Sequence, residues 1–109
     1  MANLNALLEL PGVVAAGEFS NDGQLIDLVG DMTVKAGKVA ALMASANMAS
    51  AKMQTAGWTS HTGKDGFEPA IGFAISGPKK SALIIKNVGV FVDNDKADFD
   101  QLFKALNEL

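Results

Sequence analysis

The first third of the chain changes from a helical to a strand-like hydrophobic period. Three leucines that follow Asn3 recur at helical spacing, and asparagine is a residue type that commonly caps helices. Pro11-Gly12 ends this helix, because proline lacks the amide hydrogen that a helix needs. Residues 12–19 then carry small or apolar side chains on both faces, which is typical of a central strand covered on both sides.

Asn21-Asp22-Gly23 separates that strand from a second one, residues 24–29. Asparagine, aspartate and glycine tolerate the positive φ that tight hairpin turns require. The tripeptide therefore predicts a β-hairpin. Its acidic tip indicates no further chemistry, and we interpret it as a turn.

The longest periodic segment is Met32–Ala56, which is rich in alanine, contains no proline and is predicted to end at Gly57. One apolar stripe, here called the Val39 stripe, consists of Val39, Leu42, Ala46, Ala49, Met53 and Ala56. A softer one, the Met43 stripe, consists of Met32, Ala36, Ala40, Met43, Asn47 and Ser50. A surface helix normally shows a single apolar stripe. We therefore expect this helix to be covered on two sides.

The last third predicts three strands and a helix. Trp58–Gly66 is expected to be a polar loop or a short hairpin arm, and 69–76 alternates like an edge strand that begins at a proline. The apolar run 81–92 is long for one strand, so we expect two strands with a turn near Asn87. One bulged strand is the alternative. The final helix, capped by Asn94 or Asp95, has this apolar stripe: Phe99, Leu102, Phe103, Leu106 and Leu109.

The predicted element order is α-β-β-α-β-β-β-α. Several strands are apolar on both faces, so helices must cover both sides of one sheet. The expected fold class is therefore α+β, with three α/β/α layers around a five-stranded, mainly antiparallel sheet. The length of 109 residues corresponds to one domain, residues 1–109.

Two segments carry a resemblance to a known family: PGVVAAGEFSNDGQLI (11–26) and NVGVFVDN (87–94). Together with the first leucines and the long middle helix, they resemble the roadblock/longin-like proteins, which include the dynein light chain roadblock type and share a profilin-like fold. Within that group the chain is similar to a small family of prokaryotic roadblock-type proteins. Some members of that family are encoded near a heterodisulfide-reductase-like complex in sulfur-oxidising bacteria.

The resemblance implies a non-catalytic scaffold that forms a homodimer through an edge strand and the middle helix. It also implies a further protein partner, such as a small GTPase or a subunit of a redox complex. The expected interface combines the Met43 stripe with one face of the edge strand: Met32, Ala36, Ala40, Met43, Asn47, Ser50, Ala70, Gly72, Ala74 and Ser76. The unprotected edge and the second stripe of the helix support this interface independently of the resemblance.

The amino-acid composition argues against several other classes of function. The net charge is −3, so we expect neither nucleic acid nor an anionic membrane as a partner. The chain has no cysteine and one histidine, which argues against disulfides, thiolate chemistry and a multi-histidine metal site. Its basic residues are all lysines, so it cannot supply an arginine finger. We expect a cytoplasmic protein without a cofactor or metal.

The segment Trp58–Gly66 carries the remaining candidate chemistry. Trp58, His61 and Lys64 could form a small-molecule pocket, because an aromatic ring beside polar groups is a common binding arrangement. His61 could alternatively act as a general base for a neighbouring hydroxyl, although no carboxylate is placed to orient it. A homodimeric interaction module is the first hypothesis, a ligand-sensing domain the second and an enzyme the third.

Overall fold

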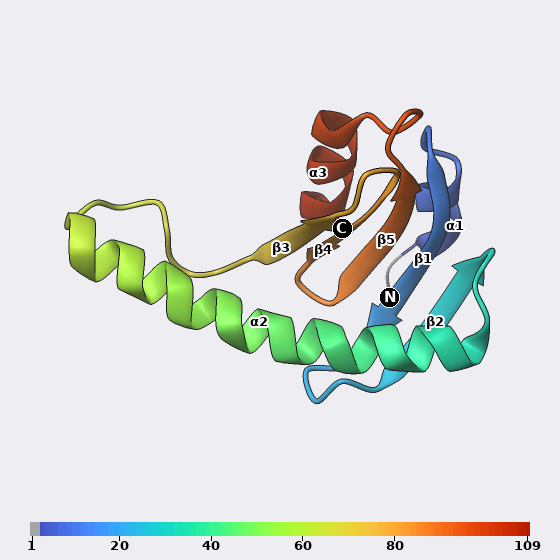
Figure 1. Cartoon of the computed structure of the whole chain (residues 1–109). Helices are drawn as coiled ribbons and strands as arrows, with labels where there is room; N and C mark the ends of the chain where they lie inside the picture. The colour runs from blue at the N-terminus through green and yellow to red at the C-terminus, as the bar shows by residue number, and fades with distance from the viewer. Residues whose placement is uncertain (1–2) are drawn as a thin grey trace.

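The computed structural model describes residues 3–109 and has the predicted order of elements. The elements are α1 (Leu4–Leu8), β1 (Val13–Phe19), β2 (Leu25–Gly30), α2 (Val34–Thr62), β3 (Gly72–Ser76), β4 (Lys80–Ile85), β5 (Val88–Asp93) and α3 (Phe99–Asn107). The strands form one antiparallel sheet in the order β2-β1-β5-β4-β3. Helices α1 and α3 lie on one face and α2 crosses the other, which confirms the predicted three layers (Figure 1).

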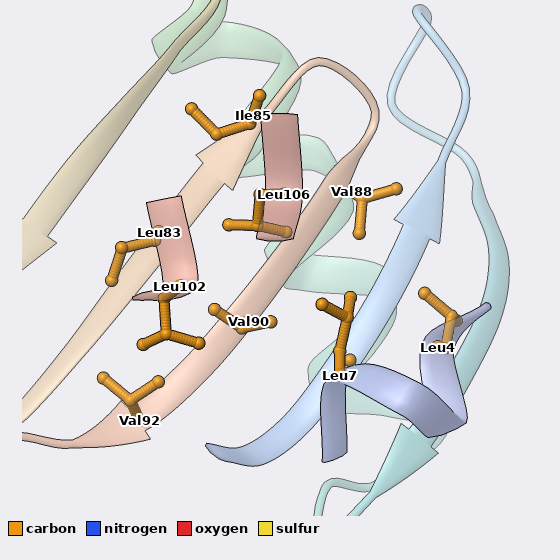
Figure 2. Packing of buried hydrophobic residues seen from close by; sticks show 10 residues of the cluster. Leu4, Leu7, Leu83, Ile85, Val88, Val90, Val92, Leu102 and Leu106 are labelled. Carbon is orange, nitrogen blue, oxygen red and sulfur yellow. The ribbon is translucent and has the colours of Figure 1, made fainter. Parts of the chain in front are cut away.

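The main core lies between the sheet and the helices α1 and α3. Leu102 and Leu106 of α3 are both 1% exposed, and they share a cluster with Leu4 and Leu7 of α1. These leucines pack against Val90 and other residues of β4 and β5, as Figure 2 shows. Phe99 and Phe103 were predicted to belong to the same stripe, but they are 40% and 49% exposed. They flank the leucines on the helix and so remain outside the core.

Helix α2 is longer than predicted. Thr33 caps its N-terminus by accepting a hydrogen bond from the amide of Ala36 at 3.1 Å. The helix continues through Gly57 and ends only at Gly63, whose φ of 66° is the left-handed conformation typical of helix C-termini. The expectation of a loop or hairpin arm at Trp58–Gly66 was therefore wrong for its first five residues, which form the last turns of α2.

Small residues allow α2 to approach its own sheet. Its buried residues are Gly37, Ala41 and Ala44, and all lie in the N-terminal half. A Cβ atom on Gly37 would lie only 2.9 Å from Leu28 Cδ2, so an alanine there would require the Leu28 side chain to shift. Neither predicted stripe is the face that packs on the sheet, because this third set of small residues takes that place.

The remaining boundaries correct details of the prediction. Residues 80–93 form two strands joined at Lys86-Asn87, which confirms the two-strand interpretation over a single bulged strand. Strand β3 begins at Gly72, three residues later than predicted. The cap of α3 is Asp98 and not Asn94 or Asp95, since its side chain accepts from the amide of Gln101 at 3.1 Å.

Candidate protein-interaction surface

An apolar groove lies between α2 and the exposed half of its sheet face. It has a volume of about 330 Å³, and its lining comes from α2 and from all five strands. The strands contribute large side chains to its floor, notably Phe19, Phe73, Ile75, Ile84 and Phe91. Phe19 and Ile84 are buried beneath Ala41 and Ala44 of α2, whereas Ile75 is 54% exposed, so α2 covers only part of this sheet face.

The C-terminal half of α2 extends past the edge strand β3, as Figure 1 shows. The helix has 29 residues, about 43 Å at 1.5 Å per residue, which matches the molecule's longest extent of 42 Å. No residue after Ala44 is fully buried on this helix. A second, more polar groove separates this overhanging part from β3, between Trp58 and Ile75.

Strand β3 has a free edge, because within residues 3–109 it pairs only with β4. Its two faces differ in character. Phe73 and Ile75 point to the side of α2, whereas Gly72 and Ala74 pair with Ile85 and Leu83 on the side of α3. An unprotected edge of this kind is a template for pairing with another strand.

The structure distributes the residues of the expected interface over two grooves, and it brings Asn47 and Ser50 together with Gly72 and Ala74 in the second one. Four residues of the Met43 stripe line the apolar groove: Met32, Ala40, Met43 and Asn47. Ser50 lines the second groove, and Ala36 is exposed in the first turn of α2. By their register, Gly72, Ala74 and Ser76 belong to the α3 side of the sheet, with Ala70 preceding the strand, but Gly72 and Ala74 also border the second groove. The face of β3 that adjoins the Met43 stripe belongs instead to Phe73 and Ile75, whose alternation with the small residues was visible in the sequence.

The candidate ligand residues lie near the C-terminal end of α2. Trp58 is 54% exposed, and its ring stacks on Phe67 with centroids 6.2 Å apart. His61 and Lys64 are also exposed, one in the last turn of the helix and the other just beyond it. Trp58 lines the second groove, but neither His61 nor Lys64 lines either groove.

Charged and polar residues at one end of β4 and β5 have structural partners. Lys80 forms an ion pair with Asp93 across the two strands, and this hydrogen bond lowers the pKa of Asp93 and raises that of Lys80. Beside it, Ser81 donates to Asn94 Oδ1 at 2.6 Å, and the Asn94 amide donates to the Gly77 carbonyl at 2.9 Å. Within residues 3–109, no group of three or more histidine or carboxylate side chains could hold a metal ion.

The first hairpin is tied to the rest of the molecule through Asn21. Its carbonyl accepts from Ser45 Oγ of α2 at 3.0 Å, and its side-chain oxygen accepts from Asn87 Nδ2 at 2.9 Å. Gly23 has a φ of 87°, and a Cβ there would lie 3.3 Å from Leu42 Cδ2. The turn that the sequence predicted therefore borders the outward side of α2.

Residues 3–108 match a family described as uncharacterized conserved protein (DUF2173). The chain belongs to this family. Proteins with curated functions include no significant relative of this DUF2173 chain.

Solved structures place this DUF2173 protein in the roadblock fold. A Roadblock/LC7 domain from Streptomyces avermitilis aligns with a TM-score of 0.76 at 15% identity, over 96% of this chain and 86% of the other. MglB from Myxococcus xanthus aligns with a TM-score of 0.66 at 17% identity, over 88% and 76%. The resemblance drawn from the two sequence segments is thus confirmed at the level of the fold.

The structure gives no sign of a membrane-spanning helix in the part of the chain that it describes. Among residues 3–109, no helix is long and apolar enough to span a bilayer.

Proposed function

We propose that this DUF2173 protein is a non-catalytic interaction module that functions as a homodimer. The observation that carries the proposal is the mismatch between α2 and its sheet. The C-terminal half of α2 reaches β3 only across a groove and then extends past it, while the apolar groove on the same sheet face is covered by α2 on one side only among the described residues. A second copy supplies both missing parts.

A two-fold axis perpendicular to the sheet beside β3 relates the two copies. The β3 strands then pair edge to edge, and α2 of each copy lies on the same side of a continuous sheet. The overhanging half of each α2 consequently lies above the partner's groove. Along α2 the sheet-facing positions continue beyond Ala44 as Ala51, Thr55 and Trp58, so these side chains point toward the partner's Phe73 and Ile75.

The proposed interface differs from the one expected from sequence on the strand side only. The Met43 stripe keeps its role, because Met43 and Asn47 already border the groove. The large residues of β3 replace the small ones as its strand contribution. This choice buries more apolar area, and burial of apolar area is the main favourable term in association.

A non-catalytic role agrees with the surroundings of the one histidine. His61 is exposed at the end of the overhanging helix, and no carboxylate of residues 3–109 forms a hydrogen bond with it there. General base catalysis normally requires a base held in place beside the proton that it removes. Exposed hydroxyls beside it, such as that of Thr62, donate to backbone carbonyls of the helix.

The dimer is tested by one charge introduced at the free edge. Ile75 in β3 is 54% exposed and Ile26 in the opposite edge strand is 56% exposed, so they form a matched pair. We expect Ile75→Lys to be monomeric at micromolar concentration, because the lysine would be desolvated at the centre of the interface. Ile26→Lys should keep twice the chain mass, as should the wild type. Light scattering after size exclusion measures all three.

A wild-type chain that is monomeric at 100 μM, or a dimer that survives Ile75→Lys and dissociates with Ile26→Lys, would refute this arrangement. Circular dichroism of both variants checks that each remains folded.

The protein that binds the dimer is the second part of the proposal. A small GTPase and a heterodisulfide-reductase-like subunit are the two candidates, and co-purification of each with the wild type and with Ile75→Lys compares them directly.

A further inference from the structure

The Val39 stripe on α2 faces outward, and among residues 3–109 only the β1–β2 turn borders it, at Leu42. Val39, Leu42 and Met53 are 49%, 61% and 72% exposed, and the alanines between them are exposed as well. Successive members of the stripe are alternately three and four residues apart over 18 residues. This is the heptad spacing by which one helix packs against another.

Lysines flank this stripe at the positions that form ion pairs between paired helices. With Val39, Ala46 and Met53 as heptad position a, Lys38 and Lys52 both occupy position g. They are two heptads apart, about 21 Å along the helix. Both are exposed, and neither is in an ion pair within the described part of the chain.

The sign of the charge on α2 is opposite to that of the rest of the molecule. The helix contains three lysines and no acidic residue, so all 12 carboxylate side chains of the chain lie elsewhere. The β1–β2 turn beside Leu42 carries Asp22, which accepts a hydrogen bond from Ser20. A basic, apolar stripe on an acidic protein indicates a partner of complementary charge.

We propose that the Val39 stripe binds an amphipathic helix of another protein whose apolar heptads are flanked by carboxylates. Those carboxylates pair with Lys38 and Lys52, and the alanines at positions 46 and 49 allow the two helices to approach closely. This inference rests on the interaction role proposed above. It uses a different face of α2 from the homodimer, because the groove-lining Met43 stripe and the Val39 stripe lie on separate sides of the helix.

A second copy of this chain does not fit the same stripe. Packed antiparallel along it, two such helices would bring Lys38 of one copy to Lys52 of the other, and these like charges repel. Packed in parallel, they would offer the lysines no carboxylate, because α2 contains no acidic residue. An anionic lipid surface is also a poor fit, since half of the stripe is alanine and lacks the large side chains that insert into a bilayer. An acidic helix of another protein matches both the heptad spacing of the Val39 stripe and the positive charge of Lys38 and Lys52.

Two synthetic peptides test the proposal with the full-length chain. Both are 21-residue helices with leucine and alanine at the a and d positions, one with glutamate at e and g and the other with lysine. Fluorescence anisotropy should show binding of the glutamate peptide and at least about tenfold weaker binding of the lysine peptide. Lys38→Glu/Lys52→Glu should reverse this order, while Lys79→Glu/Lys104→Glu, which changes two exposed lysines elsewhere, should leave it unchanged.

Met53→Asp removes an exposed apolar member of the stripe and should weaken binding of the glutamate peptide by at least about tenfold. The proposal is overturned by any of three results: no binding of the glutamate peptide, equal binding of both peptides, or binding only to vesicles of phosphatidylserine and phosphatidylcholine. The mass in solution separates this proposal from the dimer. A monomeric wild type that still binds the glutamate peptide refutes the dimer alone, and Lys38→Glu/Lys52→Glu should retain the mass of the wild type.

Discussion

At the scale of single residues, two glycines with similar backbone conformations have different surroundings. Gly30 has a φ of 96° at the end of β2, and a Cβ there would lie 2.4 Å from the Val14 carbonyl oxygen. Gly66 has a φ of 105°, but a Cβ there would have no neighbour within 4 Å among the described residues. Both resist substitution because of the backbone conformation, whereas only Gly30 also lacks the space for a methyl group.

We therefore expect Gly30→Ala to lower the free energy of unfolding by about 3 kcal/mol, from combined backbone strain and steric clash. Gly66→Ala should lower the free energy of unfolding by only about 1 kcal/mol, because the alanine would have backbone strain but no steric clash. Urea unfolding followed by circular dichroism compares the two variants. Equal losses would show that β1 does not approach Gly30 closely.

At the scale of elements, the strands form where the hydrophobic pattern predicted them, but α2 ends later in the chain than predicted. The glycine at position 57 looked like a helix terminus, because glycine is common just after the last turn. Glycine inside a helix gives the same local signal, and the choice between the two depends on what surrounds the following residues. Gly57 lies six residues before the actual C-cap, and a Cβ added to it would meet no atom of residues 3–109 within 4 Å.

Gly57→Ala is accordingly expected to stabilise the C-terminal half of α2 by about 0.5–1 kcal/mol, because alanine loses less conformational entropy in a helix. Amide hydrogen exchange of residues after position 57 should slow relative to the wild type. Faster exchange, or a lower thermal midpoint, would place the helix terminus at Gly57 after all. Gly37→Ala is the contrasting variant and should lack this gain, since its Cβ would lie 2.9 and 3.1 Å from Cδ2 of Leu28 and Leu25, which must both shift.

At the scale of the whole molecule, one helix both covers its own sheet and extends beyond it. The stripes along α2 were evident from sequence, because apolar residues recur on more than one side of the helix. The side of α2 that packs on the sheet was not evident from the sequence. The small residues at positions 37, 41 and 44 contribute little hydrophobicity, and they fit there because the helix and the sheet lie close together. The choice between the two faces of β3 likewise depended on the position of α2 over the sheet.

Trp58, the only tryptophan, reports on the proposed dimer directly. In one copy Trp58 is 54% exposed. The proposed dimer would place it over the partner's groove. We expect its emission maximum to move to longer wavelength on dilution, in parallel with the fall in mass, because the ring becomes hydrated. Ile75→Lys should show the longer wavelength at every concentration. An emission maximum that stays constant while the dimer dissociates would place Trp58 outside the interface.

Local sequence patterns were sufficient to predict the order of elements, the hairpin turn at residues 21–23, the three layers and the apolar surface on more than one side of the middle helix. These features follow from local periods and turn residues, which depend on neighbours along the chain. Tertiary structure alone decided where α2 ends, which of its sides packs on the sheet, and that Phe73 and Ile75 line the groove. The physical reason is that close packing between distant segments depends on the space available, which no local pattern contains.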